Sequence, residues 1–135
     1  MKAADTSLVV AAFASWHQVH EPARRALDGG LALIEHCALE TYSVLTRLPP
    51  PHRAPGPVVR DFLAARFPTP FLRLSAAAYR TFILDLPDRL VTGGAAYDAL
   101  VAATAIANDA ELITCDRRAT SLYDRYGVRS LLLLP

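Results

Sequence analysis

The last part of the chain decides the fold: residues 111–134 read ELITCDRRATSLYDRYGVRSLLLL. Glu111–Thr114 is short and apolar and predicts a buried strand, Arg117–Tyr126 predicts a helix, and Val128–Leu134 predicts a last, very apolar strand. Short apolar strands that alternate with helices favour a layered α/β fold with a mainly parallel sheet.

The same alternation runs through the rest of the chain. Further strands are expected at Met1–Asp5, Leu31–Ile34 and Phe71–Leu74, and helices at Ser7–Ala14, Val19–Leu27, Ala38–Arg47, Val58–Phe67, Ser75–Leu84 and Ala96–Asn108. Leu48–Pro57 holds five prolines and a glycine, which indicates a loop. In parallel α/β sheets, sites lie beyond the carboxyl ends of the strands, near the point where strand order reverses.

Composition limits the class of protein. The chain has 135 residues, 53% hydrophobic and 20% charged, which excludes a disordered protein and favours a single domain over residues 1–135. The net charge of +1 over the whole molecule gives no reason to expect tight binding to nucleic acid or to an anionic membrane. Cys37 and Cys115 are too few for a disulfide framework and are expected to be free thiols in a cytoplasmic protein. Neither a secretory signal nor a membrane span is predicted.

Four carboxylates stand out because apolar sequence surrounds them or a strand precedes them. Asp5 is the only charge between Lys2 and Glu21, and Glu40 and Asp98 are similarly isolated. The fourth, Asp116, follows the strand Glu111–Thr114. A structural explanation is available for each. Asp5 and Asp116 are placed as helix caps, and Glu40 and Asp98 are placed in first helical turns, where the helix dipole favours an anion.

Taken together, these four acids point to a metal. In a parallel sheet all four positions fall on the same edge, where two such charges about 4 Å apart repel by roughly 4 kcal/mol at an effective dielectric near 20. Divalent cations would hold them together, and all-oxygen ligands suit Mg²⁺ or Mn²⁺. Such a cluster is typical of phosphodiester hydrolysis. The thirteen acids less these four leave nine, against fourteen basic residues, a balance that suits a polyanionic substrate.

Four segments resemble the PIN domain, and more narrowly the VapC toxins of bacterial VapBC toxin–antitoxin pairs. They are Asp5-Thr6-Ser7, the stretch around Glu40 from Leu39 to Pro49, the stretch Tyr97–Ala105, and Leu112–Arg118. The segments occur in the family's order and span the whole chain. The proline-rich loop at residues 49–57 departs from the family pattern, and no substrate contact is carried across it.

The resemblance implies a fold, an activity and partners. The fold is a three-layer α/β/α sandwich with a mainly parallel five-stranded sheet. The activity is that of a Mg²⁺- or Mn²⁺-dependent endoribonuclease acting on RNA. The partner is a small cognate VapB-like antitoxin. A homodimer is expected in addition, but the resemblance does not carry it and the sequence does not indicate the oligomeric state. The residues that match the catalytic, metal-binding quartet are Asp5, Glu40, Asp98 and Asp116, and those that match hydroxyl positions near the metal are Ser7 and Thr114.

Other readings stay open. Arg117 and Arg118 are candidates for phosphate contacts or simply solvated charges. The four histidines have no metal-ligand spacing and are expected to be surface or packing residues. A catalytically silent PIN-like nucleic-acid or protein-binding domain is the alternative function. A phosphotransfer enzyme is disfavoured, because residue 7 is Ser7 rather than a second Asp and no lysine follows Lys2. The RNA cleaved and the number of metal ions are not indicated.

Overall fold

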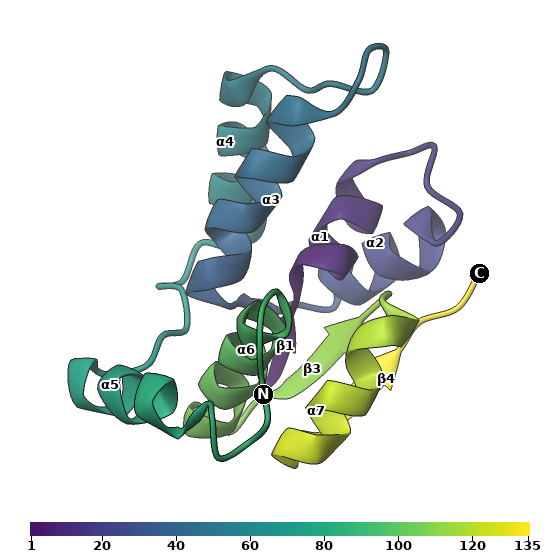
Figure 1. Cartoon of the computed structure of the whole chain (residues 1–135). Helices are drawn as coiled ribbons and strands as arrows, with labels where there is room; N and C mark the ends of the chain where they lie inside the picture. The colour runs from purple at the N-terminus through teal and green to yellow at the C-terminus, as the bar shows by residue number, and fades with distance from the viewer.

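The computed structural model describes the whole chain, residues 1–135, as short strands separated by helices (Figure 1). The strands are β1 (Lys2–Ala4), β2 (Ala32–Leu33), β3 (Glu111–Thr114) and β4 (Ser130–Leu132). The helices are α1 (Thr6–Phe13), α2 (His20–Asp28), α3 (Glu35–Arg47), α4 (Gly56–Arg66), α5 (Ala76–Asp85), α6 (Ala95–Ala107), the 3₁₀ turn η1 (Arg117–Ala119) and α7 (Thr120–Tyr126).

All four strands are parallel and lie in the order β2-β1-β3-β4. The order reverses at β1, which pairs with β2 on one side and with β3 on the other. Helices flank the sheet, with α6 and α7 packed together against β3 and β4, and α1 and α2 packed together on the far side of β1 (Figure 1). The predicted α/β sandwich is therefore confirmed, and the carboxyl ends of β1 and β3 lie side by side.

The prediction of five strands is wrong by one. The segment Phe71–Leu74 forms a single parallel bridge, between Ile34 and Leu72. Its two hydrogen bonds are both 2.8 Å long: the Leu72 N–H donates to the Leu33 carbonyl, and the Glu35 N–H donates to the Leu72 carbonyl. Pro70 just before the bridge has no N–H to donate, and α5 begins soon after it. The segment therefore has no room to extend into a strand.

Two helix starts also differ from expectation. Helix α3 begins at Glu35 rather than Ala38, so Glu40 lies in the second turn and the prediction of a first-turn acid is wrong there. The predicted helix at Arg117–Tyr126 begins with η1 before continuing as α7. Gly127, with φ of 81°, ends α7 in the left-handed conformation that glycine adopts without strain.

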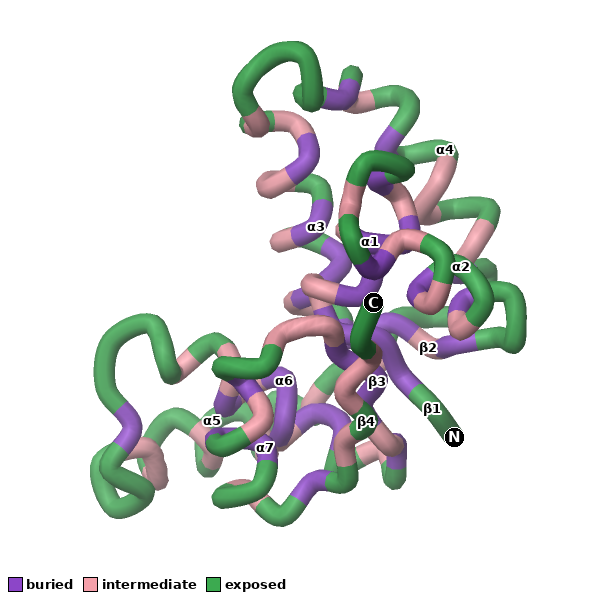
Figure 2. The backbone as a smooth tube through the Cα atoms, turned by 90° about the vertical axis from the view of Figure 1, so that its right-hand side faces the viewer, coloured by how far each residue is buried: buried purple, intermediate pink, exposed green.

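The buried residues, purple in Figure 2, are concentrated in the strands and in the helices that flank the sheet. The main core is one cluster of 23 buried hydrophobic residues, and it includes Ala3 and Ala4 of β1 and Leu112 and Ile113 of β3. Helix α5 differs from the others because none of its residues is buried. No helix of the chain combines the length and the apolar character that crossing a membrane needs.

Candidate functional site: an acidic pocket at the sheet edge

A pocket of about 170 Å³ opens where the strand order reverses, at the carboxyl ends of β1 and β3. Its lining residues come from α1, α3, α6 and α7 and from the ends of the two strands: Asp5, Thr6, Ser7, Cys37, Glu40, Asp98, Val101, Asp116 and Tyr123. All four predicted acids therefore meet at one place. We call this the acidic pocket, and its volume leaves room for several water molecules.

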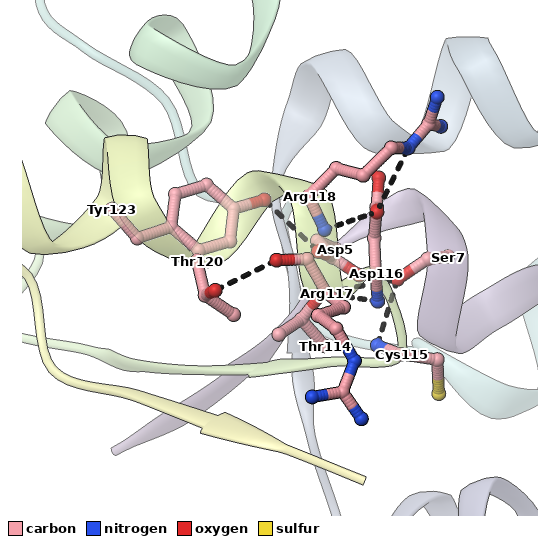
Figure 3. A network of polar contacts seen from close by, with 9 residues as sticks. All are labelled: Asp5, Ser7, Thr114, Cys115, Asp116, Arg117, Arg118, Thr120 and Tyr123. Carbon is pink, nitrogen blue, oxygen red and sulfur yellow. Dashed lines mark hydrogen bonds and ion pairs between the residues drawn. The ribbon is translucent and has the colours of Figure 1, made fainter. Parts of the chain in front are cut away.

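Asp5 lies deepest in the acidic pocket, with 4% of its surface exposed. It follows β1 and caps α1, because its Oδ1 accepts a hydrogen bond from the Leu8 N–H at 3.1 Å. The Ser7 hydroxyl also donates to Oδ1, at 2.6 Å, and the Tyr123 hydroxyl donates to Oδ2 at 2.9 Å (Figure 3). Burial raises the pKa of Asp5, and these hydrogen bonds partly oppose that rise.

The hydroxyls of Ser7 and Thr114 form an ordered chain of hydrogen bonds. Ser7 has one hydroxyl proton, which it donates to Asp5, so the 3.1 Å bond between Ser7 and Thr114 is donated by Thr114. Thr114 in turn accepts from the Asp116 N–H at 3.0 Å, and Ser7 accepts from the Cys115 N–H at 2.8 Å. Ser7 lines the acidic pocket as predicted, whereas Thr114 is fully buried beneath it. Together the two hydroxyls connect the ends of β1 and β3.

Asp116 combines a cap with a place in the acidic pocket. Its Oδ1 accepts from the Arg118 N–H at 2.9 Å and caps η1, and the Arg118 Nε lies 3.5 Å from the same oxygen (Figure 3). No hydrogen bond involves its Oδ2. The capping explanation is therefore correct for both Asp5 and Asp116, but it leaves part of each carboxylate available to a ligand. Neither Arg117 nor Arg118 lines the pocket, and the Arg118 side chain is 94% exposed at its rim.

Glu40 projects from α3 toward the same pocket and has a neighbour that the sequence interpretation missed. The Nε2 of His36, one turn earlier, lies 3.5 Å from Oε2 of Glu40 and lowers the pKa of that carboxyl. The histidines are expected to be surface or packing residues, and His36 is a packing residue that also lies beside Glu40. Its ring stacks on Tyr97, with centroids 5.3 Å apart and planes 6° apart. The i,i+4 spacing of His36 and Glu40 was the available signal.

Asp98, in the first turn of α6, is half-buried and has no hydrogen bond or ion pair. Burial raises its pKa, and the charges of Asp116, Asp5 and Glu40 raise it further. A carboxylate that faces three others without a donor is an unfavourable arrangement for the metal-free protein. A cation bound among these carboxylates would relieve this electrostatic conflict.

The residues around the acidic pocket fit a hard divalent cation in their chemistry. The donors are carboxylate and hydroxyl oxygens, no lysine or arginine lines the pocket, and the buried Thr6 Oγ1 has no hydrogen-bond partner. The carboxylates surround the pocket without converging, since no three His, Cys, Asp or Glu side chains lie close enough to form a ready-made metal site. Mutual repulsion accounts for this separation.

Comparison with known proteins agrees with this geometry. The PIN domain model matches residues 3–125. The chain is 52% identical over 128 residues to Ribonuclease VapC40 of Mycobacterium tuberculosis, covering 95% of this chain and 96% of that protein. It is 41% identical over 131 residues to Ribonuclease VapC27 of the same species, covering 93% and 92%.

A solved structure, the crystal structure of FitAcB from Neisseria gonorrhoeae, shares the fold with a TM-score of 0.68 at 18% identity, covering 97% of this chain and 96% of that chain. The match of the PIN domain model spans most of the residues, and both VapC relatives cover almost the whole chain. The chain therefore belongs to the PIN-domain family and, within it, to the VapC ribonuclease toxins of VapBC toxin–antitoxin systems.

Proposed function

We propose that the acidic pocket holds Mg²⁺ or Mn²⁺ and that the protein is an endoribonuclease, which hydrolyses phosphodiester bonds inside an RNA strand. The observation that supports this most strongly is that Asp5, Glu40, Asp98 and Asp116 line one pocket with no basic side chain among them. Ribonucleases of this family are generally metal-dependent. The chemistry that a divalent cation supplies here is activation of water and neutralisation of charge on the phosphate oxygens.

The chain's own residues prepare the pocket for that chemistry. Ser7 and Tyr123 hold the Asp5 carboxylate in one orientation, and Thr114 orients Ser7. The Arg118 guanidinium pairs with Asp116 through Nε at 3.5 Å, and because the side chain is 94% exposed its other nitrogens can meet a phosphate oxygen; Arg117 precedes it in η1. The alternative, a catalytically silent domain, would have no use for four carboxylates that raise the free energy of the metal-free protein.

The test is cleavage of labelled RNA in the presence of Mg²⁺, Mn²⁺ or EDTA. We expect cleavage with either metal and none in EDTA. Glu40→Gln should reduce cleavage at least 10²-fold, since it removes a charge from the pocket. Glu35→Gln is the matched control, because Glu35 lies on the same helix but outside the acidic pocket. Cleavage by metal-stripped wild type in EDTA, or equal losses in both variants, would contradict the proposal.

We also infer that a small VapB-like antitoxin restrains the enzyme. An apolar hollow of about 510 Å³ lies along α3 and α4, lined by Tyr42, Leu63 and Phe71 among others. An antitoxin segment that covers these helices could place a basic side chain in the acidic pocket. Co-expression with the neighbouring short gene should give a stable complex and restore growth. Equal growth with and without that gene, for a chain that cleaves RNA, would exclude this role.

A homodimer is the assembly that the exposed face of α5 supports. Tyr79, Ile83 and Leu84 of this helix are 44%, 46% and 61% exposed, and Leu90 just beyond it is 83% exposed. Such apolar exposure over neighbouring residues is typical of an interface. We infer that the enzyme acts in the cytoplasm, and the two free thiols are consistent with that reducing compartment.

A further inference from the structure

Tyr123 is a buried polar group that the resemblance to the family does not explain. It lies on α7, 118 residues from Asp5, and only 1% of its surface is exposed. Its hydroxyl makes one hydrogen bond, to Oδ2 of Asp5 at 2.9 Å (Figure 3). A tyrosine hydroxyl in an otherwise apolar core is therefore aimed at the most buried carboxylate of the acidic pocket.

The hydrogen bonds of Asp5 leave one place for a ligand. An ionised carboxylate offers about four lone-pair positions, two on each oxygen. Ser7 and Leu8 occupy both positions on Oδ1, and Tyr123 occupies one on Oδ2. These donors leave a position on Oδ2 unoccupied, so Oδ2 is the oxygen through which we expect Asp5 to bind a cation.

The Tyr123 hydroxyl is a fixed donor in this arrangement. Its ring is buried, with 1% of its surface exposed, and its hydroxyl donates to Oδ2 of Asp5 at 2.9 Å. With its ring held in the core, it cannot follow Asp5 if the carboxylate turns. A rotation that brought both oxygens toward the pocket would break the bond to Tyr123 and those to Ser7 and Leu8.

We propose that Tyr123 is a positioning residue that holds Asp5 as a one-oxygen ligand and so favours Mg²⁺ and Mn²⁺ over Ca²⁺; this rests on the proposed function of the acidic pocket. Mg²⁺ demands near-octahedral geometry and is usually bound through one or two carboxylates, and Mn²⁺ also takes octahedral oxygen sites. Ca²⁺ accepts carboxylates through one or both oxygens in looser, larger shells. A carboxylate held by three donors suits the first geometry.

The test is calorimetric titration of Mn²⁺ and Ca²⁺ into the metal-stripped protein. In Tyr123→Phe we expect the Kd for Mn²⁺ to rise about 10-fold or more, as when other hydrogen bonds to metal ligands are removed. The Kd for Ca²⁺ should change much less, so the Ca²⁺/Mn²⁺ preference shifts toward Ca²⁺. Tyr126→Phe is the matched control, because Tyr126 lies on the same helix and its hydroxyl makes no hydrogen bond. It should leave both constants unchanged.

Unchanged constants in Tyr123→Phe, or an equal change for both metals, would overturn the assignment of a positioning role. Failure of the wild type itself to bind Mn²⁺ would overturn the proposed function first. A measurement on the wild type alone guards against a variant that does not fold. A crystal structure with Mn²⁺ should show Asp5 bound through Oδ2 with the Tyr123 bond intact, and two-oxygen binding would contradict the proposal.

Discussion

The hydroxyls of Ser7 and Thr114 lie 3.1 Å apart and connect residues 107 positions apart in sequence. Ser7 is in the first turn of α1, and Thr114 is the last residue of β3. Since Ser7 also donates to Asp5 and accepts from the Cys115 N–H, this pair joins two neighbouring strand ends at the acidic pocket. The position of Asp5 relative to Asp116 therefore depends on a small polar network as well as on the sheet.

Ser7→Ala should destabilise the metal-free protein by about 1–3 kcal/mol. The change removes a donor from a buried carboxylate and leaves the Cys115 N–H without its acceptor, and unmade buried hydrogen bonds cost about this much. Chemical denaturation in EDTA measures the loss. Ser121→Ala, at an exposed position of α7, is the control and should change stability by less than about 0.5 kcal/mol. Equal effects in the two variants would show that the network contributes little.

The stability difference between Asp98→Asn and wild type should depend on pH as expected for a carboxylate whose ionised form is unfavourable in the folded protein. Because the pKa of Asp98 is raised above 3.8 in the folded state, its contribution to stability is complete below that pH and is lost as the pH rises through the raised value. Asn stays neutral throughout. In EDTA, the melting temperature of the variant relative to wild type should therefore rise with pH above about 4. A melting temperature of the variant that falls relative to wild type as the pH rises would instead indicate a salt-bridged Asp98. That result would contradict the repulsion among the carboxylates of the acidic pocket.

Both cysteines should titrate as free but slow thiols. Cys37 is buried and Cys115 half-buried, and burial raises the pKa of both, that of Cys115 to about 12. Because the thiolate is the reactive form, a disulfide reagent at about pH 8 should label the native protein slowly, Cys115 first. In denaturant, two thiols per chain should react quickly. Fewer than two reactive thiols would indicate a disulfide. That result would contradict the strand order, in which β1 separates β2, the strand before Cys37, from β3, the strand before Cys115.

Substitution on α5 tests the homodimer. Leu84→Arg places a charge on the exposed apolar face, near the carboxyl end of the helix, where a cation does not oppose the dipole. Light scattering should find a dimer for the wild type and a weaker dimer or monomer for the variant. Leu134→Arg, at a residue 54% exposed near the C-terminus, should remain dimeric. A monomeric wild type would remove α5 as the interface.

Much of the site could be predicted because its residues follow regular elements. Asp5 and Asp116 come after strands, and parallel pairing brings their positions together whatever the helices do. Asp98 could be recognised as a site candidate because it is the only charged residue in a long apolar stretch. The local sequence pattern was thus sufficient to predict that the four acids lie at one edge of the sheet, and all four line the acidic pocket there.

The rest depended on contacts that local pattern does not carry. Tyr123 contacts Asp5 across 118 residues, and in sequence it is one of two tyrosines on the same helix. The prediction of a fifth strand was wrong because the segment after Pro70 pairs with the sheet only through the single bridge between Ile34 and Leu72. The start of α3 at Glu35 moved Glu40 by a turn, and this also brought His36 beside it.

The central claim is that the four carboxylates bind the cation that RNA cleavage needs. The most direct measurement is a pair of melting curves, in EDTA and in Mn²⁺, beside an RNA cleavage assay. The proteins are wild type, Asp98→Asn and the control Asp109→Asn, whose residue lies two positions beyond the end of α6. Wild type and control should gain about 2.7 kcal/mol at a Mn²⁺ concentration of 100 times the Kd, or roughly 10 °C, and should cleave RNA. Asp98→Asn should melt no lower than wild type in EDTA, gain little from Mn²⁺ and lose cleavage. An Asp98→Asn protein that keeps both the full Mn²⁺ shift and full cleavage would contradict the account.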